Sequence, residues 1–372
     1  MTDFNAGGGL KILVLGGDGV GPEVMAQALR VLRWFGGRLP LQALEMPYGL
    51  SAWRAEGAIL PARTLAAVHA ADAVLFGAIG GDYAGVPVDV RREGSILRLR
   101  RELGLYANLR PVRYWPALAR SCPLRAEVAA GTDIALVREN TGGLYFGTPR
   151  GIETLADGRR QAVNTQRYAS DEIERVARFA FDLARGRQHR VCSVDKSNVL
   201  ETGVLWRETV TALHRREYAD LTLSHMLVDN CAMQLVRAPT QFDVIVTDNM
   251  FGDILSDGAG AVAGSLGMLP SASLGAIGAN GRRNALYEPV HGSAPDIEGL
   301  GIANPIGAIL SVAMLLKHSA GAAAEADRLE RAVEAALAAG ARCADIAAPG
   351  EAALGTVAMG DAVIAALDRQ AG

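Results

Sequence analysis

The sequence predicts an α/β fold, and three observations support this prediction. First, short apolar runs rich in valine and isoleucine alternate with helical patterns almost throughout the chain. Second, 50% of the 372 residues are hydrophobic and 21% are charged, a globular composition with material for a full core. Third, no internal repeat and no long low-complexity linker interrupts the alternation. The length allows two domains or one large one.

Each expected element has a local signal. Strands are expected at residues 11–16, 72–77, 133–138, 190–195 and 242–247, which are β-branched or continuously apolar. Helices are expected from Pro22 onward and over residues 94–105, 172–185, 322–339 and 355–369. Gly340 ends the Ala-rich helix, and Pro111 prevents a helix from continuing past Arg110.

Residues 145–168 depart from the alternation. Turn signals lie at Pro149–Gly151 and at Asp157-Gly158, and the stretch contains no amphipathic helix. We therefore predict a β-hairpin arm. Such an arm usually needs a partner surface, which favours an oligomer.

Composition and charge exclude several functions. The net charge of −3 gives no electrostatic case for nucleic-acid binding. The four cysteines show no CxxC spacing, which is typical of reduced thiols in a cytoplasmic protein and argues against zinc. The apolar run 306–316 is too short to span a bilayer. Residues 1–9 lack the basic and apolar segments of a signal peptide, so none is expected.

A pair of aspartates follows the strand at 242–247. We expect a turn through Asn249 and Gly252, and then a helix that places Asp253 and Asp257 four residues apart on one face. Like charges at that spacing repel each other by a few tenths of a kcal/mol. Two carboxylates after a strand suggest a seat for Mg²⁺ or Mn²⁺. A solvated acidic face near a helix N-terminus is the alternative.

A glycine-rich loop at residues 16–22 follows the first strand. It does not fit the G-x-G-x-x-G dinucleotide register, because the third glycine would fall on Pro22. No acidic strand end follows convincingly about 20 positions later. The loop therefore indicates close approach of its backbone to another segment, and by itself it does not predict NAD binding.

Several arginines are candidates for binding an anionic substrate. Arg98, Arg100 and Arg101 lie on the expected helix 94–105, where most arginines are solvated. Arg110 and Arg138 are stronger candidates, because each is expected where a helix or strand gives way to a loop. The guanidinium group suits bidentate carboxylate binding. Together with a divalent cation, the arginines imply a carboxylated substrate.

Eight stretches in family order carry a resemblance that covers nearly the whole chain. They are residues 17–23, 105–111, 137–147, 194–200, 243–247, 251–257, 264–275 and 288–297. With them the chain resembles the isocitrate/isopropylmalate family of β-decarboxylating dehydrogenases of 2-hydroxy acids. The resemblance implies a two-domain fold that is not a Rossmann fold. Domain 1, on the cofactor side, would comprise residues 1–105 and 264–372.

Domain 2, residues 106–263, would then hold substrate and metal and carry the arm. The resemblance also implies a homodimer whose arms clasp, and an active cleft between the domains that a second subunit completes. A small 2-hydroxy acid would be the substrate, with no nucleic acid or membrane as partner and a cytoplasmic location.

The resemblance assigns a role to each matching residue. Arg100, Arg110 and Arg138 would bind the malate carboxylates. Asp253 and Asp257 would bind Mg²⁺ or Mn²⁺ together with Asp229 of the other subunit, although Asp229 alone could be a strand-end turn residue. Lys196 and Tyr145 would handle protons. The other expected contacts are Ile96, Leu97, Asn198 and Val199 for substrate, and Glu288, His291, Gly292, Ser293, Ala294, Asp296, Ile297 and Asn304 for the cofactor.

These residue types suit metal-dependent oxidative decarboxylation of a 3-substituted malate. Lys196 would accept the proton of the 2-hydroxyl as hydride passes to the nicotinamide, provided that nearby cations favour its neutral form. The metal would stabilise the enolate as CO₂ leaves, and Tyr145 would protonate the carbon. Asp296 favours NAD, because a carboxylate there would repel the 2′-phosphate of NADP.

The apolar pair Ile96 and Leu97 favours an alkyl side chain, so 3-isopropylmalate, a substrate of leucine biosynthesis, is the expected substrate. Some positions depart from the family pattern. Asn140 replaces the usual leucine, Gly16 replaces a proline, Asp248 replaces a small residue, and residues 80–87 lack the usual tryptophan. Tartrate, malate, homoisocitrate or another alkylmalate therefore remain alternatives. A silent regulatory subunit is disfavoured by the intact set of proton-handling and metal residues.

Overall fold

The computed structural model describes residue 4 and residues 8–279 and 281–371. Most of the segment for which no signal peptide is expected, residues 1–3 and 5–7, lies outside the described part. The chain forms two compact units. The first comprises residues 1–105, 114–130 and 260–372, and the second comprises residues 106–113 and 131–259.

This division differs from the sequence-based one at two places. Residues 114–130 and 260–263 group with the first unit rather than the second. Two contacts explain the placement of 114–130. Arg342 donates a hydrogen bond of 2.5 Å to the carbonyl of Ala117, and the Ser121 hydroxyl donates one of 2.5 Å to the carbonyl of Ile346.

The first unit carries most of the helices. Its elements are β1 (Leu10–Gly17), α1 (Gly21–Gly36), β2 (Leu41–Glu45), α2 (Leu50–Glu56), α3 (Ala62–Ala70), β3 (Ala73–Ala78), α4 (Val88–Glu93), α5 (Ile96–Glu102), η1 (Pro116–Leu118), α6 (Ala126–Ala129), η4 (Leu266–Met268), β11 (Pro270–Ile277), β12 (Arg283–Pro289), η5 (Pro295–Ile297), α11 (Ile306–His318), α12 (Ala323–Ala338) and α13 (Thr356–Ala371).

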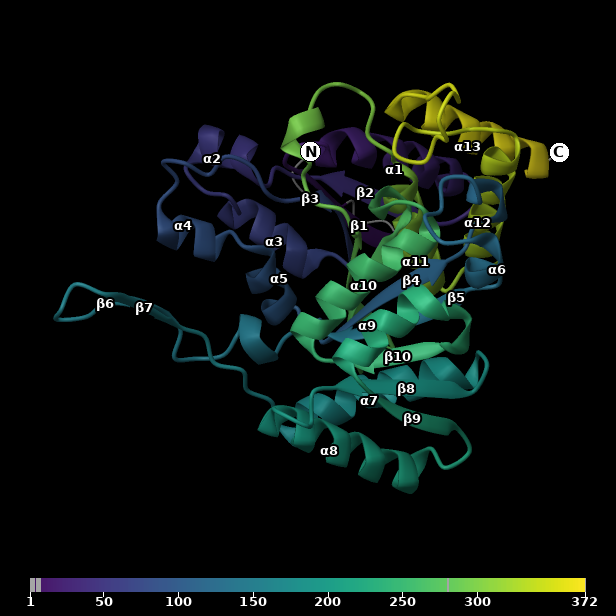
Figure 1. The fold of residues 1–372 in the computed structure, drawn as a ribbon. Helices are drawn as coiled ribbons and strands as arrows, with labels where there is room; N and C mark the ends of the chain where they lie inside the picture. Colours follow the sequence, from purple (N-terminus) through teal and green to yellow (C-terminus); the bar gives the residue numbers. More distant parts are fainter. Residues whose placement is uncertain (1–3, 5–7, 280, 372) are drawn as a thin grey trace. The chain divides into compact units, whose positions relative to one another are not determined.

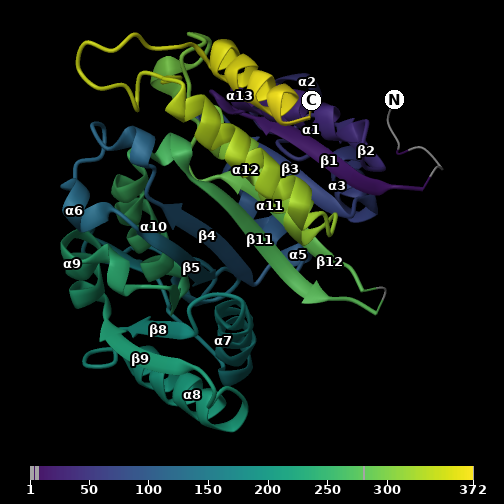
Figure 2. The ribbon, with the colours of Figure 1, turned by 90° about the vertical axis from the view of Figure 1, so that its right-hand side faces the viewer.

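Its strands lie in the order β2-β1-β3-β12-β11. The pairs are parallel except for the antiparallel pair β11–β12. One face packs against α1 and α11, and α12 and α13 lie side by side beyond α11 (Figure 2). The other face buries Leu13, Leu15, Val74 and Phe76 in a cluster with residues of α3 and α5. The result is the layered α/β arrangement that the alternating sequence predicts.

Helix α11 explains the apolar run near the C-terminus. Every residue from Ile306 to Leu316 is buried. A helix that is apolar on all sides is typical of the interior of a protein. Among the described residues, no helix combines the length and the apolar character needed to cross a membrane.

The second unit is built on five further strands in the order β4-β5-β10-β8-β9. The pair β4–β5 is antiparallel and the others are parallel. Its elements are β4 (Ala107–Arg113), β5 (Asp133–Glu139), η2 (Gly143–Tyr145), β6 (Gly151–Thr154), β7 (Arg160–Val163), α7 (Ser170–Arg185), β8 (Arg190–Asp195), α8 (Glu201–Glu217), β9 (Thr222–Leu227), α9 (Val228–Arg237), η3 (Pro239–Gln241), β10 (Val244–Thr247) and α10 (Asn249–Ala263), whose last four residues group with the first unit.

The predicted β-hairpin is confirmed. Strands β6 and β7 pair antiparallel from Gly151 opposite Val163 to Thr154 opposite Arg160. All eight of their residues are exposed, and the hairpin extends away from the helices of the second unit (Figure 1). Gly158, at a φ of 82°, allows the tight turn between the strands.

Three local predictions are wrong. The helix expected at 94–105 spans only Ile96–Glu102, because the Ser95 hydroxyl caps its start. Arg110 does not border a loop but lies within β4, since pairing with β5 continues through Pro111 to Arg113. The expected turn through Asn249 and Gly252 is absent, because helix α10 begins at Asn249 directly after β10.

Candidate active site

The strand-to-helix junction β10–α10 places the two predicted aspartates on one side of the second unit. Asp253 and Asp257 project from the first turns of α10, with side chains 33% and 51% exposed. Gly252 lets the helix lie close to β5. A Cβ atom at Gly252 would come within 2.6 Å of the Cβ and Cγ atoms of Arg138. The sequence therefore needs glycine at this position to bring the aspartates against the strand that carries Arg138.

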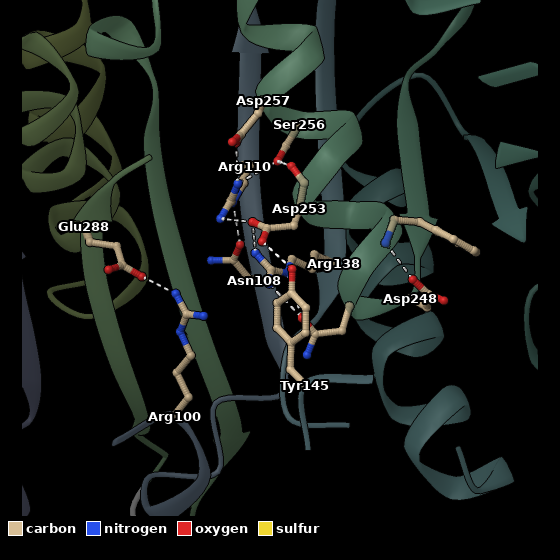
Figure 3. Close-up of polar contacts among 12 residues, drawn as sticks. Arg100, Asn108, Arg110, Arg138, Tyr145, Asp248, Asp253, Ser256, Asp257 and Glu288 are labelled. Atoms are coloured by element: carbon tan, nitrogen blue, oxygen red, sulfur yellow. Dashed lines mark hydrogen bonds and ion pairs between the residues drawn. The ribbon is translucent and has the colours of Figure 1, made fainter. Parts of the chain in front are cut away.

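Arg110 of β4 binds both aspartates (Figure 3). Its Nη1 lies 3.0 Å from Asp257 Oδ1 and 2.7 Å from Ser256 Oγ, and its Nη2 lies 3.2 Å from Asp253 Oδ1. The third donor, Nε, gives a hydrogen bond of 2.8 Å to Asn108 Oδ1. The guanidinium group, whose residue is 6% exposed, is therefore fixed by four acceptors on two elements.

Arg138, near the end of β5, is the second cation of the cluster. Its Nη1 donates to Asp253 Oδ1, while Nε and Nη2 lie 3.1 and 2.7 Å from Asn249 Oδ1. Arg138 is 1% exposed, so its charge depends on these partners rather than on water. The structure thus brings together Arg110, Arg138, Asp253 and Asp257, all of which the sequence predicted as site residues.

Tyr145 completes the cluster from the short helix η2. Its hydroxyl donates a hydrogen bond of 2.8 Å to Asp253 Oδ2, and its ring lies beneath the guanidinium of Arg138, 5.5 Å from centroid to Cζ (Figure 3). Burial and the hydrogen bond to Asp253 raise the pKa of Tyr145, so the phenol keeps its proton at neutral pH. This side chain has the protonation state of a general acid.

The charges of the cluster balance: two arginines face two aspartates. Burial raises the pKa of Asp257, the charge of Arg110 lowers it, and repulsion from Asp253 raises it again. A dicarboxylate bound at the arginines would add two negative charges. A divalent cation held by Asp253 and Asp257 would restore the balance, so these residues fit the metal that the sequence suggested.

The described residues contain no group of three His, Cys, Asp or Glu side chains that could hold a metal ion. Asp229, expected as the third ligand, lies in the first turn of α9 rather than in a strand-end turn. Its Oδ1 is 2.5 Å from Lys196 Nζ, and this hydrogen bond lowers the pKa of Asp229.

The loop after β8 carries Lys196 and two further predicted residues. Asp195 fixes this loop, because its carboxylate accepts from Ser197 N at 3.0 Å and binds Arg207 at 2.9 and 3.0 Å. Asn198 and Val199 are exposed, Val199 to 69%.

The remaining predicted residues lie in the first unit. Arg100, in the last turn of α5, forms an ion pair of 2.8 Å with Glu288 of β12, and both side chains are largely buried. Ile96 and Leu97, in the first turn of α5, are half-buried. The sequence predicted Glu288 only as a cofactor contact, and its pairing with Arg100 was not foreseen.

The glycine-rich loop approaches the segment predicted to bind the cofactor. Gly19, at a φ of 58°, would place a Cβ atom 2.0 Å from the Ser293 carbonyl, which also accepts 2.8 Å from Val20 N. His291 lies beside this contact in the chain, and burial lowers its pKa. The expected close backbone approach is thus confirmed, and its partner is Ser293.

Comparison with known proteins decides the family. The model of the isocitrate/isopropylmalate dehydrogenase family matches residues 11–363. The chain belongs to this family. The family assignment agrees with the resemblance found in the sequence, and the fold of each unit agrees with it as well.

Curated relatives and solved structures refine the likeness. The chain is 58% identical to "3-isopropylmalate dehydrogenase 1" of Bradyrhizobium diazoefficiens over 98% of its own length and 97% of that protein. It is 59% identical to the protein of the same name from Bordetella bronchiseptica, over 96% of its own length and 98% of that protein. Isocitrate dehydrogenase from Methylococcus capsulatus is similar in structure, with a TM-score of 0.83, 33% identity and coverage of 96% and 99%. A β-decarboxylating dehydrogenase from Thermococcus kodakarensis is similar as well, with a TM-score of 0.76, 36% identity, and coverage of 97% of this chain and 96% of that one.

Within this family member, some expected contacts have evident structural partners. The Asn304 side chain accepts a hydrogen bond of 3.1 Å from the backbone N–H of Ile306, the first residue of α11, and donates one of 3.1 Å to Asp345 Oδ2. Gly292 and Asp296 are exposed, whereas Ala294, at a φ of 40°, turns the chain into η5. Asp296 and Ile297 both lie in that short helix.

Sequence reasoning missed four polar residues that shape the cluster. They are Asn108, Asp248, Asn249 and Ser256, and all are buried. Two of them carry a sequence signal. Asn108 lies two residues before Arg110, on the same side of the strand, and Ser256 lies one helical turn after Asp253. A search for polar residues on the same face as the predicted site residues would have found both.

Proposed function

We propose that the protein is an NAD-dependent 3-isopropylmalate dehydrogenase that forms 4-methyl-2-oxopentanoate, CO₂ and NADH in leucine biosynthesis. The observation that supports this most is the cluster in which Arg110, Arg138 and Tyr145 all contact the metal-side aspartate Asp253. The names of the relatives point to the same substrate. Two arginines, two aspartates and a protonated phenol are what a malate with two carboxylates requires.

Asp253 and Asp257 would hold Mg²⁺ or Mn²⁺, and Asp229 of a second subunit would complete the ligand set. When bound, the metal supplies Lewis-acid polarisation of the substrate oxygens. Arg110 and Arg138, with Arg100 of the first unit, would orient the two carboxylates. Because Arg110 already lies between the aspartates, a carboxylate that it binds is brought close to the metal ligands.

Two side chains would move protons. Lys196 would accept the proton of the substrate 2-hydroxyl. Asp229 Oδ1, 2.5 Å from its Nζ, favours the ammonium form, so Lys196 would act as a base once Asp229 has turned to the metal. Tyr145 would protonate the carbon that loses CO₂, since its phenol keeps its proton at neutral pH. Asp253 accepts a hydrogen bond from the hydroxyl of Tyr145 and so orients the phenol.

The first unit would bind the cofactor. The proposed contacts are Glu288, Asn304 and the segment of His291, Gly292, Ser293, Ala294, Asp296 and Ile297. Exposed Asp296 would accept the ribose hydroxyls of NAD and repel the 2′-phosphate of NADP. The second unit would hold substrate and metal, and its β6–β7 hairpin would clasp the second subunit of a cytoplasmic homodimer.

The substrate side chain would contact Ile96, Leu97, Asn198 and Val199. An apolar surface gains about 0.8 kcal/mol per buried CH₂ group and offers no partner to a third carboxylate. We therefore expect 3-isopropylmalate to be preferred over isocitrate, tartrate, malate and homoisocitrate. Replacing Leu97 with Asn should reduce that preference by about 1–3 kcal/mol in relative kcat/KM. An unchanged preference would remove Leu97 from the pocket.

A substrate panel tests the proposal. NADH formation is measured with each 2-hydroxy acid, with NAD or NADP, and with EDTA followed by Mg²⁺ or Mn²⁺, and released CO₂ is quantified. We expect the highest kcat/KM with 3-isopropylmalate and NAD, and activity that EDTA abolishes and metal restores. Equal turnover of tartrate or homoisocitrate would refute the substrate. Activity in excess EDTA would refute the metal role.

A further inference from the structure

Asp248 is a buried carboxylate that the proposed reaction does not use. It is the last residue before α10 and is 6% exposed. Its Oδ1 accepts from Phe251 N at 2.8 Å, which caps the helix, and its Oδ2 accepts from Gln166 Nε2 at 2.8 Å. Gln166 belongs to the segment that returns from the hairpin. The two oxygens of Asp248 therefore join that segment to the helix that carries Asp253.

The returning segment in turn holds the segment of Tyr145. The carbonyl of Arg167, next to Gln166, accepts from Gly143 N at 3.1 Å. A Cβ atom at Gly147 would lie 1.8 Å from the carbonyl of Thr165, so the two segments are in close backbone contact. Tyr145 lies between these two contacts and reaches Asp253 at 2.8 Å.

These contacts close a ring that begins and ends on α10. It runs from Asp248 through Gln166 to the segment of Tyr145 and returns through the Tyr145–Asp253 hydrogen bond. The next residue of the junction reinforces it, because Asn249 N donates 2.9 Å to the hydroxyl of Tyr168. Within such a ring, loss of one contact loosens the geometry of the others.

We propose that Asp248 is a positioning residue that fixes the phenol of Tyr145 relative to Asp253, acting through Gln166. The inference rests on the proposed function, in which Tyr145 donates the final proton. It assigns Asp248 an effect on that proton transfer rather than on the binding of substrate. A shift of one ångström in a proton donor is enough to slow catalysis by about 100-fold.

The surroundings of Asp248 show that its charge is costly to keep. Burial, the largest effect, raises its pKa, the two hydrogen bonds and Arg138 lower it, buried Glu139 raises it, and the resulting pKa is about 6. Asp195, Lys196 and Tyr168 line a small cavity beside it.

Three variants test the inference. Asp248→Ala removes both contacts, Gln166→Leu removes the link from the other side, and Asp248→Asn keeps the helix cap and can still bond a rotated Gln166 amide. We expect kcat to fall at least tenfold in the first two, with KM within threefold, and the solvent isotope effect on kcat to rise. Asp248→Asn should stay within threefold of the wild type.

The phenol of Tyr145 gives a readout that does not need turnover. Its titration is followed by NMR with ring-labelled tyrosine, and Tyr145→Phe assigns the signal. The pKa should fall toward its ordinary value in Gln166→Leu and stay raised in Asp248→Asn. An unchanged phenol pKa and kcat in Gln166→Leu would overturn the inference, as would an Asp248→Asn enzyme as slow as Asp248→Ala. Absence of turnover in the wild type would instead refute the proposed function, and the titration would still decide the positioning role.

Discussion

Two pairs of carboxylates lie in the second unit, and their surroundings differ. The outer pair, Asp253 and Asp257, is 33% and 51% exposed and is neutralised by Arg110 and Arg138. The inner pair, Glu139 and Asp248, is almost fully buried. Its hydrogen bonds come from neutral donors, namely backbone N–H groups, the hydroxyl of Thr141 and the amide of Gln166. The nearest charged partner is Arg175, whose Nη2 lies 3.6 Å from Glu139 Oε1.

The difference distinguishes carboxylates that can bind a ligand from carboxylates that hold the local structure. A carboxylate with charged partners and an exposed face can exchange those partners for a cation. A buried carboxylate bonded to backbone N–H groups is committed to the turn or helix that it caps. For Glu139, burial raises the pKa and three hydrogen bonds from Thr141 and Gly142 lower it. The outer pair should therefore act on the reaction directly, whereas the inner pair should affect activity only through the local fold that positions the site.

The largest effect is expected from Asp253→Asn. The variant keeps one acceptor oxygen, which can serve Arg138 or Tyr145 but not both. It also loses the charge that would hold the metal, and the metal contributes several kcal/mol to the transition state. We expect kcat to fall at least about 1,000-fold, while the free energy of unfolding changes by no more than about 2 kcal/mol. Steady-state kinetics and urea unfolding measure both. The exposed Asp89→Asn on α4 is the control, and comparable activity of the two variants would contradict the assignment.

The inner pair is tested by Asp248→Asn through stability. The folded pKa of about 6 lies above the ordinary value of 3.8, so the folded state binds this proton more tightly. The stability contributed by protonated Asp248 is present below pH 3.8 and is lost as the pH rises to about 6. Asp248→Asn has no carboxyl group at this position, so its stability does not fall over this pH range. Above pH 6 it should be more stable than the wild type by up to about 3 kcal/mol.

Urea unfolding at pH 4 and pH 8 measures the difference. The two proteins should converge at the lower pH, where the wild-type carboxyl is protonated. A wild type that is the more stable protein at pH 8 would mean that the charge of Asp248 supports folding rather than opposing it.

A smaller effect should follow from Gly252→Ala. The added Cβ would meet Arg138 at 2.6 Å, so the side chain or α10 must shift. We expect a loss of about 1–3 kcal/mol in unfolding free energy together with reduced kcat/KM. Gly258→Ala on the same helix is the matched control, because nothing lies within 4 Å of its Cβ. It should stabilise the protein by up to about 1 kcal/mol. Equal effects of the two substitutions would argue against close packing of α10 on Arg138.

The sequence predicted the surroundings of the outer pair far better than those of the inner pair. The alternation of strands and helices, the hairpin and the residues Arg110, Arg138, Asp253 and Tyr145 were all accessible from motifs, because chemistry restricts their types and spacing. The structure brings these four into contact. The contacts of Asp248 were not accessible. They join residues 82 positions apart, and no periodicity links Gln166 to a helix cap.

Local errors have a similar cause. Pro111 indicated a break, but antiparallel pairing from Ala107 to Arg113 determines the strand. Asn249 and Gly252 indicated a turn, but the cap by Asp248 starts the helix at once. In each case a tertiary or capping contact outweighs an intrinsic preference, and such contacts are invisible to composition.

Binding of Mn²⁺ tests the central comparison most directly. Isothermal titration in the presence of 3-isopropylmalate would compare the wild type with Asp257→Asn from the outer pair and Glu139→Gln from the inner pair. We predict that Asp257→Asn weakens binding by at least about tenfold. Glu139→Gln, which keeps one of its two acceptor oxygens and lies away from the metal ligands, should stay within about threefold. Unchanged Mn²⁺ affinity in Asp257→Asn, or an equal loss in both variants, would contradict the division into a metal-binding and a scaffold pair.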